Sequence, residues 1–370
     1  MDLDLDLDVV IVGGGQAGLA TAWHLVRLNR RREVPLSFEV LDDRAHPGGA
    51  WQDGWPSLEL FSPAAYSSLP GWPMPPWRGA GNPSAAHVRD YLIAYEQRYD
   101  LPVRRPVTVT GICGVGDTSG PLVVQADQPQ GRTERRAQVV VNATGSWRRP
   151  FWPTVPGMRD FAGTQRHTAD YAGPSSYDGL RVLVVGGGNS GAQVAADLLP
   201  VARELTWATQ RPPRYLPNDV DGRALFEAAT QAVAGHGGGV AGLGDIVAVP
   251  SVRHARDHLG LRSTTMPARL TASGACWADG TERALDAVIW CTGFRPALGH
   301  LRGLHGLPRT NGHPATLQDH RVVSSDDERL LFVGYGDWCG PASATLIGVG
   351  RAAKDAADQA AAVVDGLVDG

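Results

Sequence analysis

Cysteine is scarce in this chain of 370 residues: it has four, Cys113, Cys276, Cys291 and Cys339, and no two lie close together in sequence. Because there is no CxxC pair and no metal-ligand spacing, we expect neither a disulfide framework nor a metal site. The same absence argues against a dithiol redox enzyme of the thioredoxin-reductase type. It also argues against chelation of trivalent arsenic, which prefers several close thiolates.

The sequence also lacks a block of charge of one sign and a long apolar run. Its 34 basic and 38 acidic residues are scattered, and a net charge of −4 gives no general attraction to nucleic acid or to an anionic membrane. No apolar stretch is long enough to cross a membrane, and the acidic alternation over residues 2–8 is the opposite of a secretory signal. We therefore expect a cytoplasmic protein that binds neither nucleic acid nor membrane.

Glycine, by contrast, is abundant, and two glycine-rich segments have the same form. Residues 13–18 and 186–191 both match GxGxxG, and each follows an aliphatic run, at 9–12 and 182–185. In dinucleotide-binding folds the first glycine permits a tight turn, the second admits a pyrophosphate and the third lets the helix pack on its strand. The pair predicts an α/β protein with two Rossmann-like dinucleotide-binding domains, each of three-layer ββα form.

A second internal echo predicts that one domain is inserted into the other. The segment VVVNATG at 139–145 is matched by AVIWCTG at 287–293, and each is followed by an Arg-Pro pair. We interpret each segment as the end of a nucleotide-binding unit, where the chain crosses to its neighbour. The prediction is a first domain formed by residues 1–155 and 286–370, with an inserted domain at 156–285.

The residues after the second strand of each domain distinguish the two nucleotides. Asp42 ends a strand predicted at 37–41, where an acid binds ribose hydroxyls, although the neighbouring Asp43 could serve instead. In the inserted domain no acid occurs from residue 205 through 218, and Arg211 and Arg214 stand there. This favours the 2′-phosphate of NADPH over NADH, with FAD in the first domain, although either arginine could be only a solvated surface charge.

Two longer motifs carry a family resemblance. Residues 48–51 (GGAW) and 161–171 (FAGTQRHTADY) match the GGxW and FxGxxxHxxxY fingerprints. The chain therefore resembles the class B flavin-containing monooxygenases over essentially its whole length. The segments 55–63, 66–75, 333–338 and 342–351 resemble more closely the bacterial flavin monooxygenases encoded in arsenic-resistance operons.

The resemblance implies an NADPH- and FAD-dependent monooxygenase whose cofactors carry the chemistry. NADPH reduces FAD, reduced flavin traps molecular oxygen as a C4a-hydroperoxide, and a sulfur, nitrogen or trivalent arsenic lone pair of a small molecule takes an oxygen atom. No catalytic acid, base or nucleophile is required from the chain, which agrees with the lack of a Ser/His/Asp or Cys/His arrangement. Loops at 61–77 and 210–245 are expected to select the substrate.

The turns, the strand ends and the fingerprints together define the expected binding residues. For FAD they are Gly13, Gly15, Gln16, Ala17, Gly18, Asp42, Asp43, Gly49, Ala50, Trp51, Ala143, Thr144, Gly145, Asp337, Ala344, Thr345 and Leu346. For NADPH they are Gly186, Gly188, Asn189, Ser190, Gly191, Arg211, Arg214, Thr292 and Gly293. A small-residue helix is expected to begin near residue 342, with its N-terminus towards the flavin.

Three further residues are candidates for positions beside the flavin: Phe61, Ser62 and His167. His167 either contributes to the joint near NADPH or is purely structural. Asp337 either binds the ribityl chain or caps a turn. Trp51 is either a flavin neighbour or a core aromatic, and so is Trp338.

One position departs from the family pattern. Many family members carry an asparagine two residues before the proline that aligns with Pro63, where it supports the nicotinamide and the oxygenated flavin; here Phe61 stands in its place. The alternatives are therefore an NADPH oxidase or another NAD(P)H:acceptor flavoprotein, and a non-catalytic FAD-binding redox sensor. A homodimer is the default expectation for the oligomeric state.

Overall fold

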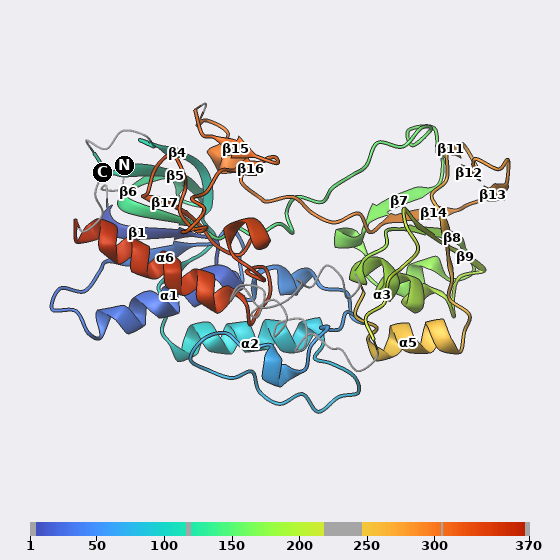
Figure 1. Ribbon diagram of the computed structural model, residues 1–370, viewed down its shortest axis with the longest axis horizontal. Coiled ribbons are helices and arrows are strands. Elements are labelled where there is room, and N and C mark those ends of the chain that lie inside the picture. The colour runs from blue at the N-terminus through green and yellow to red at the C-terminus, as the bar shows by residue number, and fades with distance from the viewer. Residues whose placement is uncertain (1–4, 116–119, 218–245, 305, 367–370) are drawn as a thin grey trace.

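The computed structural model describes residues 5–115, 120–217, 246–304 and 306–366, which form two lobes side by side (Figure 1). The first lobe is built from both ends of the described chain and the second from its middle. Two extended segments cross between the lobes. The loop expected at 210–245 to select the substrate falls largely on residues 218–245, outside the described residues.

The sheet of the first lobe has the strand order β3-β2-β1-β6-β5-β4, and β17 also pairs with β6. Strands β1, β2 and β17 run parallel to their partners, whereas β4, β5 and β6 form an antiparallel meander. The strands are β1 (Leu5–Val12), β2 (Phe38–Leu41), β3 (Val103–Arg104), β4 (Thr108–Cys113), β5 (Leu122–Gln128), β6 (Gly131–Asn142) and β17 (Leu330–Phe332). The aliphatic half of β1 is buried because helices share a core with one face of the parallel part. Strands β4 and β5, with Leu298, Leu301 and Leu307, share a core with the other face.

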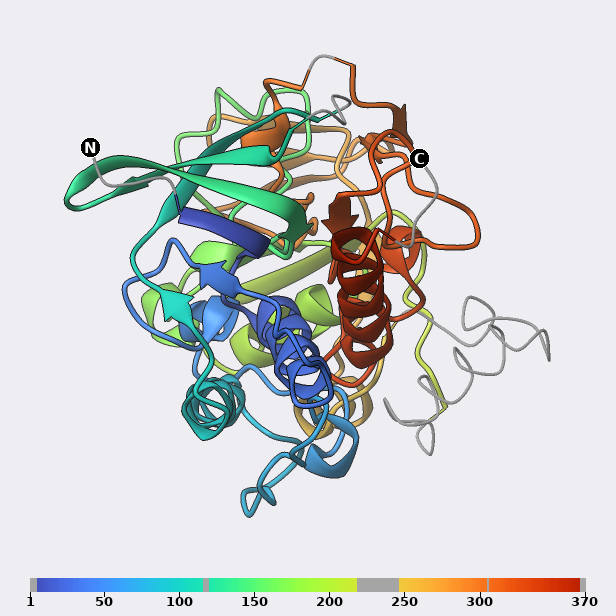
Figure 2. The same ribbon diagram turned by 90° about the vertical axis from the view of Figure 1, so that its left-hand side faces the viewer.

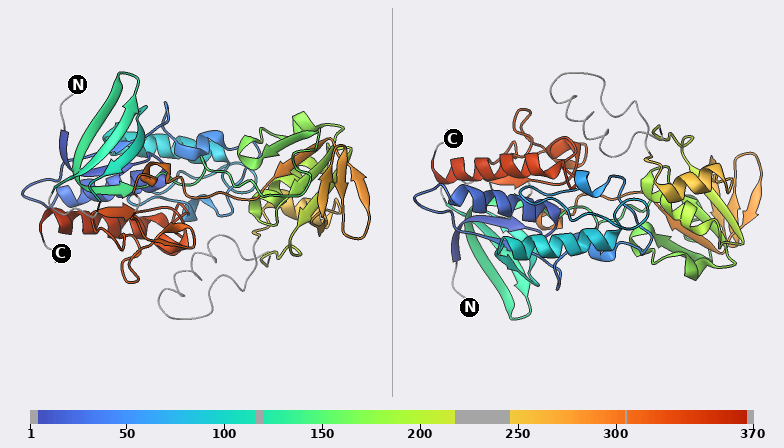
Figure 3. Two further views of the ribbon diagram at one scale, coloured as in Figure 1. Left: turned by 90° about the horizontal axis from the view of Figure 1, so that it is seen from above. Right: turned by 90° about the horizontal axis from the view of Figure 1, so that it is seen from below.

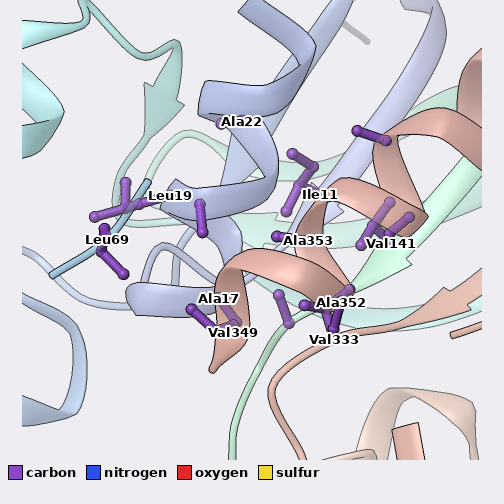
Figure 4. Packing of buried hydrophobic residues seen from close by; sticks show 14 of the residues in the cluster. Ile11, Ala17, Leu19, Ala22, Leu69, Val141, Val333, Val349, Ala352 and Ala353 are labelled. Atoms are coloured by element: carbon purple, nitrogen blue, oxygen red, sulfur yellow. The ribbon is translucent and has the colours of Figure 1, made fainter. Parts of the chain in front are cut away.

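Three helices lie side by side on one face of this sheet: α1 (Gln16–Asn29), α2 (Ala85–Arg98) and α6 (Val349–Val364) (Figures 2 and 3). Helix α6 packs on α1 through small side chains such as Ala352 and Ala353, which lie over Ile11 and Val141 of the sheet (Figure 4). The expected start of α6 near residue 342 is wrong. Residues 342–348 form turns, in which Ala342 has a φ of 55° and the Thr345 hydroxyl accepts a hydrogen bond from the Gly348 amide.

The second lobe contains a parallel sheet of order β10-β9-β8-β14-β7, formed by β7 (Thr164–His167), β8 (Arg181–Val185), β9 (Glu204–Thr209), β10 (Ser263–Thr265) and β14 (Ala287–Trp290). Helices α3 (Asn189–Leu198) and α5 (Pro250–Asp257) share a core with one face. The antiparallel strands β11 (Arg269–Thr271), β12 (Gly274–Cys276) and β13 (Glu282–Ala284) pack on the other. The predicted α/β fold with two Rossmann-like units is confirmed.

The two Thr-Gly segments noticed in the sequence meet where the lobes join. Phe151 N donates to Gly293 O at 2.9 Å, and Ala297 N donates to Gly145 O at 2.8 Å, so the crossing segments run antiparallel. The rings of Trp147 and Phe294 stack there with centroids 4.8 Å apart. The division of the chain at residues 155 and 285 stays a prediction; in the structure β14 belongs to the sheet of the second lobe, and the return crossing follows it.

Candidate functional site

A cavity of about 690 Å³ lies along the first glycine turn and extends to the second lobe. In the first lobe the cavity is lined by the turn itself, the end of β2, the residues around Trp51, and the segment that ends in Phe61. In the second lobe it is lined by Asn189, Ser190 and Gln193 of α3. The two glycine turns therefore open towards one shared space.

The first glycine turn has the close contacts that make glycine necessary. Gly13 has a φ of 112°, and a Cβ there would lie 2.5 Å from the Ala143 carbonyl oxygen. A Cβ at Gly18 would collide with the Gly13 carbonyl, and one at Gly49 would lie 2.9 Å from the Cα of Gly15. Side chains are excluded at these positions, which leaves backbone N–H groups and the N-terminus of α1 facing the cavity.

The second glycine turn repeats these contacts in the second lobe. Gly186 has a φ of 141°, and a Cβ there would collide with the Cys291 carbonyl, as one at Gly191 would with the Gly186 carbonyl. Gly188 precedes α3, and a Cβ there would meet nothing within 4 Å. The two turns are thus equivalent residue by residue, with Gly13 matching Gly186.

The match between the two turns also identifies the residue of the second lobe that corresponds to Asp42. Gly13 N donates to Leu41 O at 2.7 Å, and Gly186 N donates to Ala208 O at 3.0 Å. The residues that follow these two carbonyls are Asp42 in the first lobe and Thr209 in the second. An uncharged hydroxyl thus stands in the second site where the first has a carboxylate.

Asp42 is held by a buried ion-pair network that the sequence analysis did not identify. Arg105 Nε donates to Asp42 Oδ2 at 2.6 Å, and both terminal nitrogens of Arg105 donate to the Glu96 carboxylate, at 2.6 and 2.8 Å. Burial lowers the pKa of the Arg105 guanidinium, but the hydrogen bonds to Glu96 and Asp42 outweigh it and the net pKa is raised. Asp43 also lines the cavity, but it is exposed and pairs with Arg148 at 3.2 Å.

Gln16 connects three segments that line the cavity. Its side-chain oxygen accepts a hydrogen bond from Trp51 Nε1 at 3.1 Å, and its side-chain nitrogen donates to Ala344 O at 2.9 Å. Gly334 also lines the cavity. It has a φ of 91°, and an added Cβ would lie only 2.6 Å from the Ala17 Cβ, so the position has no room for a side chain. Gly334 is a further site residue that the sequence analysis did not single out.

Several expected FAD residues lie away from the cavity wall. Asp337 is exposed, and its carboxylate accepts a hydrogen bond from Ala342 N at 3.2 Å, which is the turn-capping alternative. Trp338 stacks on Tyr335 with ring centroids 5.5 Å apart, whereas Ala344 lines the cavity. Gly18, Thr345 and Leu346 are also outside the lining, while Gly13, Gly15, Gln16, Ala17, Gly49, Ala50, Trp51, Ala143, Thr144 and Gly145 are part of it.

His167 lies at the joint between the lobes rather than in the cavity wall. Its Nδ1 accepts a hydrogen bond from Ala169 N at 3.1 Å, so the neutral ring carries its proton on Nε2, which donates to Gly293 O at 3.1 Å. Burial lowers the pKa of His167 and favours this neutral form. Ser62 is buried and bonded to the Ser67 hydroxyl at 2.9 Å, whereas Phe61 lines the cavity.

Of the expected NADPH residues, Asn189 and Ser190 line the shared cavity. Arg211 and Arg214 are exposed on the segment that follows β9. Thr292 donates to the Phe151 carbonyl at the crossing between the lobes. Within the described ranges, no cluster of three or more His, Cys, Asp or Glu side chains could hold a metal ion, and no helix is long and apolar enough to cross a membrane.

Comparisons with known sequences follow this architecture. A model of the pyridine nucleotide-disulphide oxidoreductase family matches residues 10–219. An oxidoreductase of Geobacillus kaustophilus, named CzcO-like, is 26% identical over 363 residues, which cover 94% of this chain and 96% of that protein. Senecionine N-oxygenase of Tyria jacobaeae is 25% identical over 361 residues, which cover 92% of this chain and 68% of the relative.

Solved structures give a stronger likeness. The flavin-containing monooxygenase from Stenotrophomonas maltophilia superposes with a TM-score of 0.85 at 44% identity, covering 98% of this chain and 100% of that one. The open form of cyclohexanone monooxygenase superposes with a TM-score of 0.67 at 18% identity, covering 98% of this chain and 87% of that one, and it shares the fold alone.

Proposed function

The chain belongs to the pyridine nucleotide-disulphide oxidoreductase family and is an NAD(P)H-dependent flavin monooxygenase that uses FAD and NADPH; from this premise we propose that it oxygenates a soft nucleophilic heteroatom of a small molecule. The observation that carries the proposal is the shared cavity, which brings the first glycine turn, the N-terminus of α3 and Phe61 to one space. Because both nucleotide sites open into it, a hydride donor and a flavin can meet there.

The residues of the first turn fit FAD. Gly49 has a φ of 56°, and a Cβ there would lie 2.9 Å from the Gly15 Cα, so its backbone lies close to the turn, which supports a cradle for the pyrophosphate beside the N-terminus of α1. Asp42 is oriented by Arg105 and is suited to bind ribose hydroxyls. We propose that the isoalloxazine would lie in the same cavity, whose wall includes Trp51.

For NADPH we propose the second turn and the N-terminus of α3. Asn189 and Ser190 begin this helix, and its unpaired N–H groups attract a pyrophosphate. Thr209 stands in place of the acid that would repel a 2′-phosphate, and the exposed Arg211 and Arg214 lie just beyond it in sequence. These features support NADPH over NADH.

Bound FAD supplies the two-electron redox chemistry and the transfer of oxygen. The chain binds and orients the nucleotides and excludes water from the space between them, where Leu58, Leu60 and Phe61 form an apolar wall. A neutral thioether, amine or trivalent arsenic compound can enter a cavity with such an apolar wall. Its lone pair attacks the activated oxygen and needs no deprotonation first. The stoichiometry is one molecule of NADPH, one of O₂ and one proton consumed per oxygenated product and water formed.

The test is a substrate screen that measures coupling. NADPH oxidation, O₂ uptake, H₂O₂ release and product formation are followed with thioethers, amines, arsenite and methylated trivalent arsenicals. We expect one of these classes to give an oxygenated product and to lower the H₂O₂ released per NADPH. If H₂O₂ equals the NADPH consumed with every compound, the proposal of heteroatom oxygenation is wrong.

Phe61 favours a second candidate function, that of an NADPH oxidase. Its ring lies in the cavity wall at the position where an asparagine would offer hydrogen bonds, so it can exclude water but cannot bond to an oxygenated group. Phe61→Asn tests this idea, with Phe61→Leu as the control for lost ring volume. Asparagine should reduce H₂O₂ release in the absence of substrate, and leucine should not.

A further inference from the structure

The segment that carries Phe61 is bonded on its two edges to different lobes. On one edge, Leu60 N donates to Pro83 O at 2.9 Å and Ala85 N donates to Leu58 O at 3.0 Å, which ties the segment to the start of α2 in the first lobe. On the other edge lies Gln193 of α3. Its Oε1 accepts from Glu59 N and its Nε2 donates to Glu59 O, both at 3.1 Å.

The Gln193 side chain thus imitates a neighbouring β-strand. Residues 58–60 present alternate backbone groups to opposite sides, as a strand does, and one amide group satisfies both groups of Glu59. Gln193 is only 6% exposed, so losing these bonds would leave buried polar groups unpaired. The contact between Gln193 and Glu59 therefore requires both a donor and an acceptor, each facing the matching backbone group.

One turn further along α3, Asp197 makes a second connection to the same segment. Asp197 Oδ2 accepts hydrogen bonds from Ser57 Oγ at 2.8 Å and from Tyr171 OH at 2.7 Å. Trp55 begins the segment and packs edge-on against Tyr171, with ring centroids 5.8 Å apart, inside the core of the second lobe. Helix α3 therefore holds residues 55–61 at two successive turns.

We propose that Gln193 is a positioning residue that couples the occupation of the α3 N-terminus to the wall of the flavin cavity beside Phe61. The inference rests on the proposed NADPH site at Asn189 and Ser190, which lie one turn before Gln193 on the same helix. A rigid helix that binds the nucleotide at one end and the Glu59 backbone on its side transmits any shift directly to Phe61. Correct placement of Phe61 then accompanies nucleotide binding.

Hydrogen exchange tests the coupling without relying on turnover. In the wild-type holoenzyme, NADP⁺ should slow exchange of the amides at 186–191 and also of those at 57–61. In Gln193→Leu, NADP⁺ should protect the turn alone, and the peptide containing Glu59 should exchange at least about tenfold faster than in the wild type. Protection of neither region in the wild type would contradict the proposed NADPH site, whereas protection of the turn without residues 57–61 would contradict the coupling alone.

Reduction kinetics give a second readout. At saturating NADPH without oxygen, Gln193→Leu should reduce its flavin about tenfold more slowly, because small misplacements near reacting groups are costly. The dissociation constant for NADPH should change little, since the turn is intact. An equal loss in Gln165→Leu would show a general effect of lost bonds, because Gln165 makes two hydrogen bonds within the second lobe and none to residues 55–61.

Ser57→Ala is a milder second variant that still tests the proposal if Gln193→Leu fails to fold. It removes only the exposed hydrogen bond to Asp197, so FAD content and melting temperature should equal those of the wild type. We expect a two- to threefold slower reduction, roughly the effect of one neutral hydrogen bond. Unchanged reduction in both Ser57→Ala and Gln193→Leu would overturn the proposal.

Discussion

The two glycine turns share a backbone but differ in their surroundings. Both place a first glycine against a carbonyl of a neighbouring crossover, at Ala143 and at Cys291. The strand end beside the first turn carries Asp42 within a buried network, whereas the second has Thr209. We therefore expect the turn to set where a pyrophosphate binds and the next strand end to set which nucleotide is preferred.

The helices that follow the turns differ in the same way. Counting from the matched glycines, His24 of α1 is equivalent to Asp197 of α3. His24 Nε2 contacts Gly350 O at 3.1 Å and so pins α1 to α6 within its own lobe. Asp197 instead binds Ser57, a residue of the first chain segment. The first helix faces a permanent neighbour, and the second faces a segment of the shared cavity.

The largest effect is expected when the first glycine of each turn is changed to alanine. Gly13→Ala puts a Cβ against the Ala143 carbonyl at a positive φ, so we expect loss of FAD and of several kcal/mol of stability. Gly186→Ala makes the same clash in the second lobe, so the protein should keep FAD and lose reduction by NADPH. Absorbance of bound flavin and anaerobic reduction distinguish the two outcomes.

Gly280→Ala is the control for this pair, because Gly280 also has a positive φ of 84° but nothing lies within 4 Å of an added Cβ. It should cost only about 1 kcal/mol, the strain of a left-handed backbone. Loss of FAD from Gly186→Ala would contradict the separate roles of the two turns.

Removing Arg105 should have the next largest effect. In Arg105→Leu the buried carboxylates of Asp42 and Glu96 lose their partner, which we expect to destabilise the first lobe by about 3–5 kcal/mol and to release FAD. Urea unfolding and the FAD content of the purified protein measure this change. Arg148→Leu, which removes the exposed partner of Asp43, should stay within about 0.5 kcal/mol of the wild type.

Acid should weaken the first lobe through His24. Burial lowers the pKa of His24 from 6.5 to about 4, so the folded protein keeps this ring neutral where the unfolded chain is already protonated. The stabilisation is complete above pH 6.5 and falls as the pH drops towards 4, by about 2 kcal/mol at pH 5. Urea unfolding at pH 7 and pH 5 should show a smaller pH dependence in His24→Gln. The exposed His46→Gln should behave like the wild type.

The smallest expected effect sharpens the contrast between the strand ends. Thr209→Asp gives the second site the acid of the first, and repulsion of a 2′-phosphate should weaken NADPH binding about tenfold relative to NADH. Thr209→Asn controls for the change in shape without charge and should leave the ratio of the two dissociation constants nearly unchanged. Equal weakening of NADPH in both variants would mean that position 209 does not face the phosphate.

Local spacing in the sequence predicted where some of these residues lie, and their binding roles stay predictions. Asp42 could be located because a glycine turn fixes the distance along the chain to the next strand end. Arg105 could not, since it is 63 residues from Asp42 and no local pattern indicates that they meet. Gln193 was missed for the same reason, because its partner Glu59 is 134 residues away and contributes only backbone atoms.

The start of α6 is a different kind of error, because a helix was predicted where the structure has turns. The helix was expected to begin near residue 342, yet it begins at Val349. The segment before it includes two alanines, but Thr345 and Gly348 lower its helix propensity. Ala342 has a left-handed backbone, and the Thr345 hydroxyl donates a hydrogen bond to the Ala342 carbonyl, so these residues form turns. The Ala344 carbonyl accepts a hydrogen bond from the Gln16 side chain. Local turns and the contact with Gln16 therefore keep residues 342–348 out of the helix.

The paired crossing between the lobes also bears on how such a molecule could arise. Because Phe151 N bonds directly to Gly293 O, the second lobe leaves and re-enters the first at one point. A unit whose two ends meet can be cut out and replaced as a cassette, with its host closing over the gap by a short linker. The second lobe is therefore exchangeable in principle, and residues 57–59, which Gln193 and Asp197 hold, are part of the surface that any replacement would have to match.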